Sequence, residues 1–388
     1  EGMLDEFEFN VRKYSRPGKN SLLIRLRNDY SMLGSETQPR RWGNKLAASN
    51  SPGWDDPYAG WNCCPPGFGL YQDVYLETRT EVFIDDIFCR PNLPEKSVEL
   101  WVETEMLNGA DASNFKLSVN LYGQNFESIV AENVTKDVTI VGGRCLFKMT
   151  LKIPDEQLRL WSPSTPWLYQ MQVSLLDGSG KTRIDSAQRQ FGMRSFVIST
   201  ESEPKGRMYL NGQEVRLRGC NTMGFLQLDV MRKDWPQLID DLLLAKLTNM
   251  NFIRTTQRTV PKEVYEYADR LGMMMQADLP LFAYVNQKQF HQVLTQAGQV
   301  ERLLRNHPSV ILMSYLNEPM AGRQPHAISR VGYERMFDAL DYVVRHENPD
   351  RAIKYVDGDY QPPNKGLPDD HCYNTWYPGH GCNLPKME

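Results

Sequence analysis

Two hydrophobic patterns divide the chain near residue 197. Before this point apolar and polar residues alternate over short segments, at residues 98–104, 116–121, 147–153 and 169–175. Such alternation predicts strands that bury one face and expose the other. The Asp177-Gly178 pair predicts a hairpin turn. Short strands separated by turns over about a hundred residues are typical of an immunoglobulin-like sandwich, which we place at residues 79–197.

The first 78 residues also have a strand-like pattern. Residues 7–11 and 21–26 carry apolar strand signatures, and residues 71–76 form a third such segment. Between the second and third lies a loop, at about residues 32–69, that is rich in Gly, Pro, Ser and Trp. A loop of this length is usually functional or disordered. Its aromatic residues either stack on a sugar ring or pack locally, and the sequence leaves both options open. They are Trp42, Trp54, Tyr58, Trp61 and Phe68.

After Phe196 the pattern changes to alternating strands and helices. Strands are predicted at residues 215–219, 252–255, 273–278, 310–317, 353–357 and 370–376, and helices at 235–247, 261–271, around 300–305 and near 331–345. Successive βα units with almost continuously apolar strands predict a parallel sheet, and six in a row favour a closed barrel at residues 198–388. The alternative, a doubly wound sheet, is expected to carry a Gly-rich phosphate loop after its first strand. Residues 219–224 do not complete such a loop.

The strand predicted at residues 310–317 ends in an unusual way. Its apolar run stops at Asn317, Glu318 and Pro319, and Pro319 disfavours a helical continuation. The sequence therefore places a carboxylate at the C-terminal end of a strand, which is where barrel enzymes carry their catalytic residues. The alternative is that Glu318 is a solvent-facing residue in an ordinary turn.

Composition narrows the classes of function. A chain of 388 residues is too long for one core, so two or three domains are expected. The net charge of -4, with the charges scattered, argues against nucleic-acid binding. No apolar segment approaches the roughly 20 residues of a membrane span. Seven cysteines without a CxxC pair argue against a structural zinc site, and no cofactor is expected. The oligomeric state stays open, as does the compartment, with secretion or the periplasm slightly favoured.

Several local motifs occur in a characteristic order along almost the whole chain. They lie at residues 69–76, 160–163, 167–169, 191–194, 218–221, 251–254, 267–269 and 317–319. Together they resemble glycoside hydrolase family 2, which contains β-galactosidases, β-glucuronidases and β-mannosidases. The resemblance implies a multidomain β and α/β protein: a partial jelly-roll sandwich at residues 1–78, the immunoglobulin-like sandwich at 79–197, and a truncated (β/α)8 TIM barrel at 198–388.

The resemblance also implies roles for individual residues. Glu318 becomes the general acid/base, and Asn317 hydrogen-bonds the 2-hydroxyl of the sugar. Arg254 orients a catalytic carboxylate, although a purely structural ion pair is the alternative. Three residues after the sixth predicted strand are expected to line the sugar site: Asn374, Trp376 and Tyr377. For Trp376 the alternative is a place in the core. The implied activity is that of a retaining, exo-acting β-glycosidase with a carbohydrate substrate.

The chain departs from this family in two respects. Met223 and Gln257 stand where the family commonly has histidines that contact the substrate. The resemblance places the nucleophile on a seventh strand, and none of the glutamates after Glu318 follows a strand signature, so we expect the nucleophile beyond Glu388. The alternative function is therefore a non-catalytic carbohydrate-binding or scaffold protein. Acyl or phosphoryl transfer lacks support, because the chain has no GxSxG, P-loop or HExxH motif.

Overall fold

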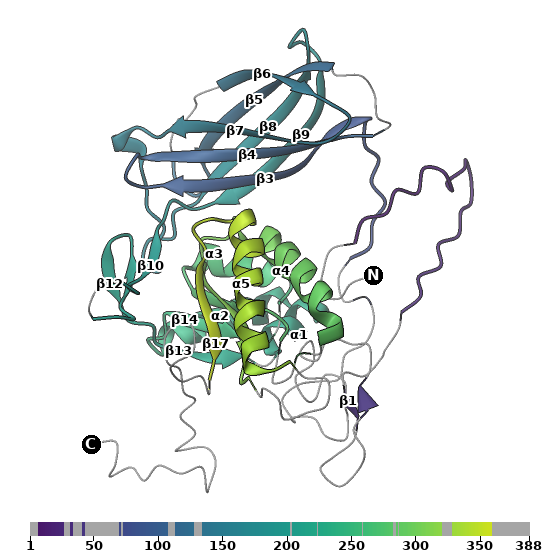
Figure 1. Ribbon diagram of the computed structural model, residues 1–388. Coiled ribbons are helices and arrows are strands. Elements are labelled where there is room, and N and C mark those ends of the chain that lie inside the picture. The colour runs from purple at the N-terminus through teal and green to yellow at the C-terminus, as the bar shows by residue number, and fades with distance from the viewer. Residues whose placement is uncertain are drawn as a thin grey trace, which may run out of the picture.

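The computed structural model describes residues 7–26, 32–33, 41–42, 70, 73–107, 113–127, 134–201, 204–222, 224–257, 259–281, 285, 287–319 and 328–358. Within this part of the chain a β-sandwich lies against one end of an α/β unit (Figure 1). The two are joined by a small sheet and by direct contacts. The fold is therefore a sandwich followed by a parallel barrel sheet, as the sequence predicts.

Among the described residues, seven antiparallel strands form the sandwich. One sheet has the order β3 (Val82–Asn92), β4 (Ser97–Met106), β7 (Gly143–Lys152), and the other has β6 (Val134–Ile140), β5 (Ser113–Gly123), β8 (Tyr169–Asp177), β9 (Arg183–Phe191). The strands predicted from alternation are confirmed as β4, β5, β7 and β8. The Asp177-Gly178 turn joins β8 to β9, which pair with each other.

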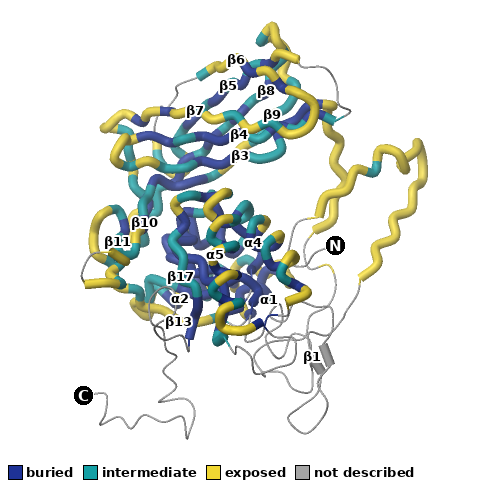
Figure 2. The backbone as a smooth tube through the Cα atoms, viewed as in Figure 1, coloured by how far each residue is buried: buried dark blue, intermediate teal, exposed yellow. Residues whose placement is uncertain are grey.

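The sandwich core follows directly from the alternation. In β5 and β8 buried residues alternate with less buried ones (Figure 2). The apolar side chains of both sheets form one cluster that includes Leu117, Val119, Val173 and Leu175. The register of β3 and β4 shifts between Ile84 and Asp86. A shift of this kind re-aims the side chains that follow it. Here it sets acidic residues of β3 on the face toward the barrel, where Asp86 meets Arg305.

A three-stranded antiparallel sheet connects the two parts. It contains β10 (Phe196–Ile198), β11 (Met208–Leu210) and β12 (Gln213–Val215). The strand predicted at residues 215–219 is wrong, because a turn with positive φ at Asn211 and Gly212 returns residues 213–215 onto β11. The first barrel strand, β13 (Gly219–Thr222), begins only where Gly219 pairs with Phe252.

The parallel sheet contains five described strands in sequence order. After β13 these are β14 (Phe252–Thr255), β15 (Met274–Asp278), β16 (Val310–Asn317) and β17 (Ala352–Asp357). Every residue of β15 and β16 is buried, which is typical of strands covered on both faces. These strands confirm four predicted ones. The sixth predicted strand, residues 370–376, lies outside the described residues.

In the described part of the chain five α-helices accompany the strands: α1 (Phe225–Arg232), α2 (Trp235–Leu247), α3 (Lys262–Leu271), α4 (Phe290–Leu304) and α5 (Arg330–Glu347). All but α1 were predicted. Local capping explains their ends: the Asp234 carboxylate accepts a hydrogen bond from the Gln237 N–H at the start of α2, and Gly272 ends α3 at φ 71°. Among the described helices, none has the length and hydrophobicity needed to cross a bilayer.

The first 78 residues differ from the prediction. Residues 7–11 and 21–26 form no strand, and their backbone has no sheet partner among the described residues. The strand predictions there are wrong, because an apolar alternation becomes a strand only where another strand pairs with it. Two short strands, β1 (Met32–Leu33) and β2 (Arg41–Trp42), pair inside the predicted loop. The jelly-roll assignment stays a prediction.

The sandwich rests on the N-terminal ends of the barrel strands. The buried Trp161 indole N–H donates to the Asp269 carbonyl at 2.9 Å, and Arg194 donates to the carbonyls of Pro308 and Val310 at 3.0 and 2.8 Å. Residue Val310 is the first of β16. These contacts of Trp161 and Arg194 therefore lie away from the C-terminal end of the sheet.

Candidate active site

Polar residues from four neighbouring strands meet at the C-terminal end of the parallel sheet. Asp278, Asn317 and Asp357 are the last residues of β15, β16 and β17, and Arg254 is the penultimate residue of β14. In parallel strands all C-terminal ends lie on one rim. All four residues are buried, so the cluster is enclosed by protein.

Arg254 holds this cluster together. Its guanidinium donates to the Asp278 carboxylate at 2.5 to 3.2 Å, to the Asn317 side-chain oxygen at 2.6 Å, and to the Asp357 carboxylate. Strands β14 and β17 are three steps apart, which is roughly 14 Å in a flat sheet. A direct Arg254–Asp357 contact requires the sheet to curve, as it does when strands close into a barrel.

The two aspartates are fully engaged by donors. Besides Arg254, Asp278 accepts from Gln276 Nε2 at 3.1 Å and from the Gln257 N–H at 2.9 Å. Asp357 accepts from Gln276 Nε2 at 2.8 Å and from Lys354 Nζ at 2.7 Å. Two cations thus face two carboxylates, which balances their charges. Carboxylate oxygens occupied in this way hold the rim in place and are poorly placed to exchange protons with a ligand.

Asn317 points the nitrogen of its side-chain amide away from Arg254. Because Arg254 donates to the amide oxygen, the amide nitrogen must face away from the guanidinium. This nitrogen has no hydrogen-bond acceptor among the described residues. An immobilised donor is therefore available at the rim.

Glu318 follows Asn317 at the point where the strand stops. Its φ of 48° is in the left-handed region, which is uncommon for a residue other than glycine, and its N–H donates to the Asp357 carbonyl at 2.9 Å. The residue is half-buried. The positive φ thus turns the chain at Glu318 away from the direction of β16, and the backbone hydrogen bond attaches Glu318 to the end of β17. Such outliers concentrate at functional sites.

Gln257 is a second non-glycine residue with positive φ, 59°, just past the end of β14. Its N–H is bound to Asp278, but its buried side-chain oxygen has no partner in the described structure. The buried hydroxyls of Thr256 and Thr259 are unpaired as well. Unpaired buried polar groups are rare in native proteins, so this stretch is suited to meet a hydroxyl-rich ligand.

The structure brings together three of the six residues expected from the sequence, Glu318, Asn317 and Arg254. The ion-pair alternative for Arg254 is real, since its partners are two barrel acids. Asn374, Trp376 and Tyr377 lie outside the described residues, as does Met223. The sequence reasoning missed Asp278, Gln276, Asp357 and Lys354. Asp278 and Asp357 each end a predicted strand, which is the same signal that singled out Glu318. No set of three or more candidate metal ligands occurs in the described ranges.

A sandwich followed by a parallel barrel sheet, with a polar cluster at the C-terminal strand ends, defines the class of the protein as a sandwich-and-barrel fold. Comparison with family models identifies the family. The model described as "Glycosyl hydrolases family 2" matches residues 82–194, and "Glycosyl hydrolases family 2, TIM barrel domain" matches residues 203–383. The chain belongs to glycosyl hydrolase family 2.

Known proteins of the same kind are much longer than this chain. The chain is 24% identical to a β-galactosidase of Priestia megaterium over 370 residues, covering 86% of the chain but 32% of the relative. It is 25% identical to human β-glucuronidase over 324 residues, covering 80% of the chain and 45% of that protein. The chain thus spans less than half the length of these relatives.

Solved structures show the same fold. A β-glucuronidase of Bacteroides uniformis superposes with a TM-score of 0.60 at 22% identity, covering 74% of this chain and 36% of the other. A β-galacturonidase of Eisenbergiella tayi bound to galacturonate gives 0.56 at 15% identity, covering 72% and 47%. At this identity the similarity establishes the architecture alone.

Proposed function

We propose that the protein is a retaining, exo-acting β-glycosidase of the β-galactosidase or β-glucuronidase type, which hydrolyses terminal sugars of oligo- or polysaccharides with Glu318 as general acid/base. Its family membership supports hydrolysis of glycosidic bonds. The resemblance to β-galactosidases and β-glucuronidases supports a β-linked sugar substrate.

The Asn317–Glu318 pair is the observation that carries the proposal. Retaining hydrolysis needs a carboxylic acid that protonates the leaving oxygen, and a hydrogen bond to the sugar 2-hydroxyl that strengthens in the transition state. Arg254 fixes the Asn317 amide so that its nitrogen can serve as that donor. Glu318, the next residue, is attached by its backbone to the end of β17. A proton donor and a hydroxyl ligand on consecutive residues match the two requirements.

The reaction proceeds in two steps. In the first, Glu318 protonates the glycosidic oxygen while a second carboxylate attacks the anomeric carbon and forms a covalent glycosyl-enzyme. In the second, Glu318 takes a proton from water, which releases the sugar with retained configuration. The second carboxylate must lie roughly 5 Å from that of Glu318. Asp278 and Asp357 are occupied by fixed donors, so we assign this role to a glutamate of another strand end.

Substitution of Glu318 by Gln tests the role of the acid. We expect Glu318→Gln to lower turnover on glycosides with poor leaving groups by about 10²–10⁴-fold, and much less on aryl glycosides whose leaving group needs no protonation. Glu156→Gln, at an exposed sandwich position, is the matched control and should retain full activity. Equal losses on both substrate types would show that Glu318 is not the proton donor. Full activity of Glu318→Gln would show that Glu318 is an ordinary turn residue.

The stereochemistry of the product tests the mechanism separately. Proton NMR of the first-formed sugar should show the β-anomer from a β-glycoside, because two successive displacements retain configuration. Release of the α-anomer first would demonstrate inversion. Saturable sugar binding without any hydrolysis would favour the non-catalytic carbohydrate-binding alternative. The presence of Gln257 where the family commonly has a histidine is in keeping with that alternative.

A further inference from the structure

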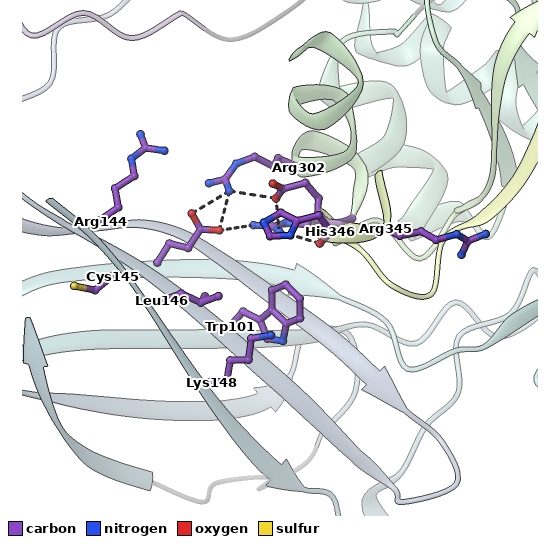
Figure 3. Close-up of a pocket in the computed structure, with 11 residues that line it drawn as sticks. Trp101, Arg144, Cys145, Leu146, Lys148, Arg302, Arg345 and His346 are labelled. Carbon is purple, nitrogen blue, oxygen red and sulfur yellow. Dashed lines mark hydrogen bonds and ion pairs between the residues drawn. The ribbon is translucent and has the colours of Figure 1, made fainter. Parts of the chain in front are cut away.

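Two networks of polar side chains join distant parts of the described chain. One surrounds a cavity of about 410 Å³ between the sandwich and the helices α4 and α5 (Figure 3). There Arg302 is paired with Glu103 and Glu347, so its charge is neutralised within the protein and the network fastens the sandwich to the helices. The other network lies at the C-terminal end of the parallel sheet and contains Gln276.

Gln276 is a buried residue in the middle of β15. It is 3% exposed and lies directly opposite Arg254 of β14. Opposed residues project from the same face of a sheet, and so do residues two apart along a strand, so Gln276, Arg254 and Asp278 share one face. A glutamine side chain carries two N–H donors, and burying them without acceptors is costly. The amide of Gln276 therefore needs acceptors inside the protein.

Two different carboxylates accept from the Gln276 amide. Its Nε2 donates to Asp278 Oδ1 at 3.1 Å and to Asp357 Oδ2 at 2.8 Å, and Asp357 lies two strands away on β17. Arg254 Nη2 and Nη1 bind the other oxygens, Asp278 Oδ2 and Asp357 Oδ1. The four side chains thus form a closed ring in which each carboxylate is held at both oxygens. Because hydrogen bonds are directional, these bonds fix the planes of both carboxylates.

The ring also fixes the group that holds Asn317. Arg254 Nη2 donates to Asp278 Oδ2 at 2.5 Å and to Asn317 Oδ1 at 2.6 Å. A guanidinium is planar and its donors have fixed directions, so its orientation decides where the Asn317 amide lies. Removal of the Gln276 amide opens the ring and releases one oxygen of each carboxylate from its second link. The orientation of Arg254 is then less defined, and so is that of Asn317.

Gln276 is not needed to neutralise charge at this end of the sheet. Arg254 and Lys354 are paired with Asp278 and Asp357, which sets two cations against two carboxylates. A neutral amide adds no charge to this balance. The contribution of Gln276 is therefore geometric, since it is the link between the two carboxylates.

We propose that Gln276 is a positioning residue for the glycosidase reaction. Without contacting the sugar, it fixes Arg254 through the two aspartates, and Arg254 fixes the Asn317 amide that donates to the sugar 2-hydroxyl. This inference rests on the proposed function, in which Asn317 has that role. The hydrogen bond to the 2-hydroxyl strengthens in the transition state, so an amide without a fixed direction slows the reaction. Loss of Gln276 should therefore reduce the advantage that a 2-hydroxyl gives to a substrate.

The test compares a glycoside with its 2-deoxy analogue on the same enzyme. The substrates are 4-nitrophenyl β-galactoside and its 2-deoxy analogue, together with the matching pair of glucuronides. The measured quantity is the ratio of kcat/KM for the parent to that for the 2-deoxy compound, which we call the 2-hydroxyl preference. Partial unfolding affects both substrates alike and cancels in this ratio. We expect Gln276→Met, which keeps the length of the side chain, to lower the preference roughly threefold to tenfold, as for one hydrogen bond.

Three further variants show whether Gln276 acts through Asn317. Asn317→Ala removes the donor itself and should lower the preference at least as far as Gln276→Met. The double variant Gln276→Met, Asn317→Ala should have the same preference as Asn317→Ala alone. Thr255→Val is the matched control, because the buried Thr255 hydroxyl donates instead to the Gln276 backbone carbonyl at 3.2 Å. Thr255→Val should keep the wild-type preference.

Gln276→Asn covers the case in which the methionine variant does not fold. It keeps the amide but is one methylene shorter, so its nitrogen cannot reach both carboxylates, and we expect an intermediate preference. The inference alone is overturned if Asn317→Ala lowers the preference and neither Gln276 variant does, or if the losses add up in the double variant. It is overturned together with the proposed function if the wild type hydrolyses neither parent glycoside, or if Asn317→Ala keeps the wild-type preference.

Discussion

Replacement of Arg254 by Met is the most direct perturbation of the candidate site. The methionine side chain fills similar space but leaves two buried aspartates without their shared cation. Arg254 and Asp278 are 4% and 2% exposed in their side chains, and Asp357 is 7% exposed. Breaking a buried ion pair by removing one partner costs about 3–5 kcal/mol. We therefore expect Arg254→Met to lower the free energy of unfolding by an amount in this range.

Urea unfolding followed by circular dichroism measures this loss. The control is Arg207→Met, which removes a surface pair with Glu214 whose side chains are 47% and 39% exposed. Exposed pairs contribute about 0–1 kcal/mol, so the control should unfold almost like the wild type. The double variant Arg254→Met, Asp278→Asn removes an orphaned charge and should recover part of the loss.

The comparison of the two single variants decides the outcome, because both remove an arginine from an ion pair and differ in burial. The reasoning is refuted if Arg254→Met and Arg207→Met are equally stable at neutral pH, because Arg254 would then contribute no more than a surface residue.

Two further predictions concern positions outside the candidate site. Burial and the neighbouring carboxylates of Asp241 and Asp234 raise the pKa of Asp229 to about 6. This folded-state pKa is above the unfolded value of about 4, so ionisation of Asp229 destabilises the fold as pH rises between the two values. Asp229→Asn should therefore raise the melting temperature at pH 8 more than at pH 4. An equal gain at both pH values would contradict this. Gly272→Ala would place a Cβ 2.5 Å from the Pro163 carbonyl oxygen, whereas Gly143→Ala, also at positive φ, meets open space. Urea unfolding should therefore show a loss about 1–3 kcal/mol larger for Gly272→Ala, and equal losses would mean that the sandwich–barrel contact yields freely.

The elements best predicted from sequence are those whose signal is local. Residues 235–247 form α2 at the predicted bounds, since Asp234 caps the helix and Pro236 fits its first turn. The nearly continuous apolar run of β16 and its stop at Asn317 were equally clear. The prediction of one strand at residues 215–219 was wrong, because the alternation runs on between two separate strands. Strand pairing sets the boundary between them: β12 pairs with β11, whereas β13 pairs with β14. The strand predictions for residues 7–11 and 21–26 were wrong for a related reason, because an apolar pattern does not supply a partner strand.

For the candidate site, sequence predicted the positions of single residues better than their partners. Arg254 was expected to orient a catalytic carboxylate, and this role stays a prediction. The contacts that the sequence did not predict are those of Arg254 with Asp278, Asp357 and Asn317. These contacts join residues of four different strands, so they depend on the curvature of the sheet. No pattern along the chain encodes which strand ends approach closely. The catalytic role of Glu318 stays a prediction until the variant is measured.

The acidic face of the sandwich has a consequence for synthesis of the protein. Asp85, Asp86 and Glu103 are translated about 200 residues before Arg302 and Arg305, with which they pair, as the separations of 199 and 219 residues for two of these hydrogen bonds show. Within the sandwich, Arg144 and Arg189 already pair with Asp85 and Asp86. A sandwich that folds first therefore holds these acids in place before the helix that carries Arg302 has been made. The docking surface for the barrel is thus complete on one side before the other side exists.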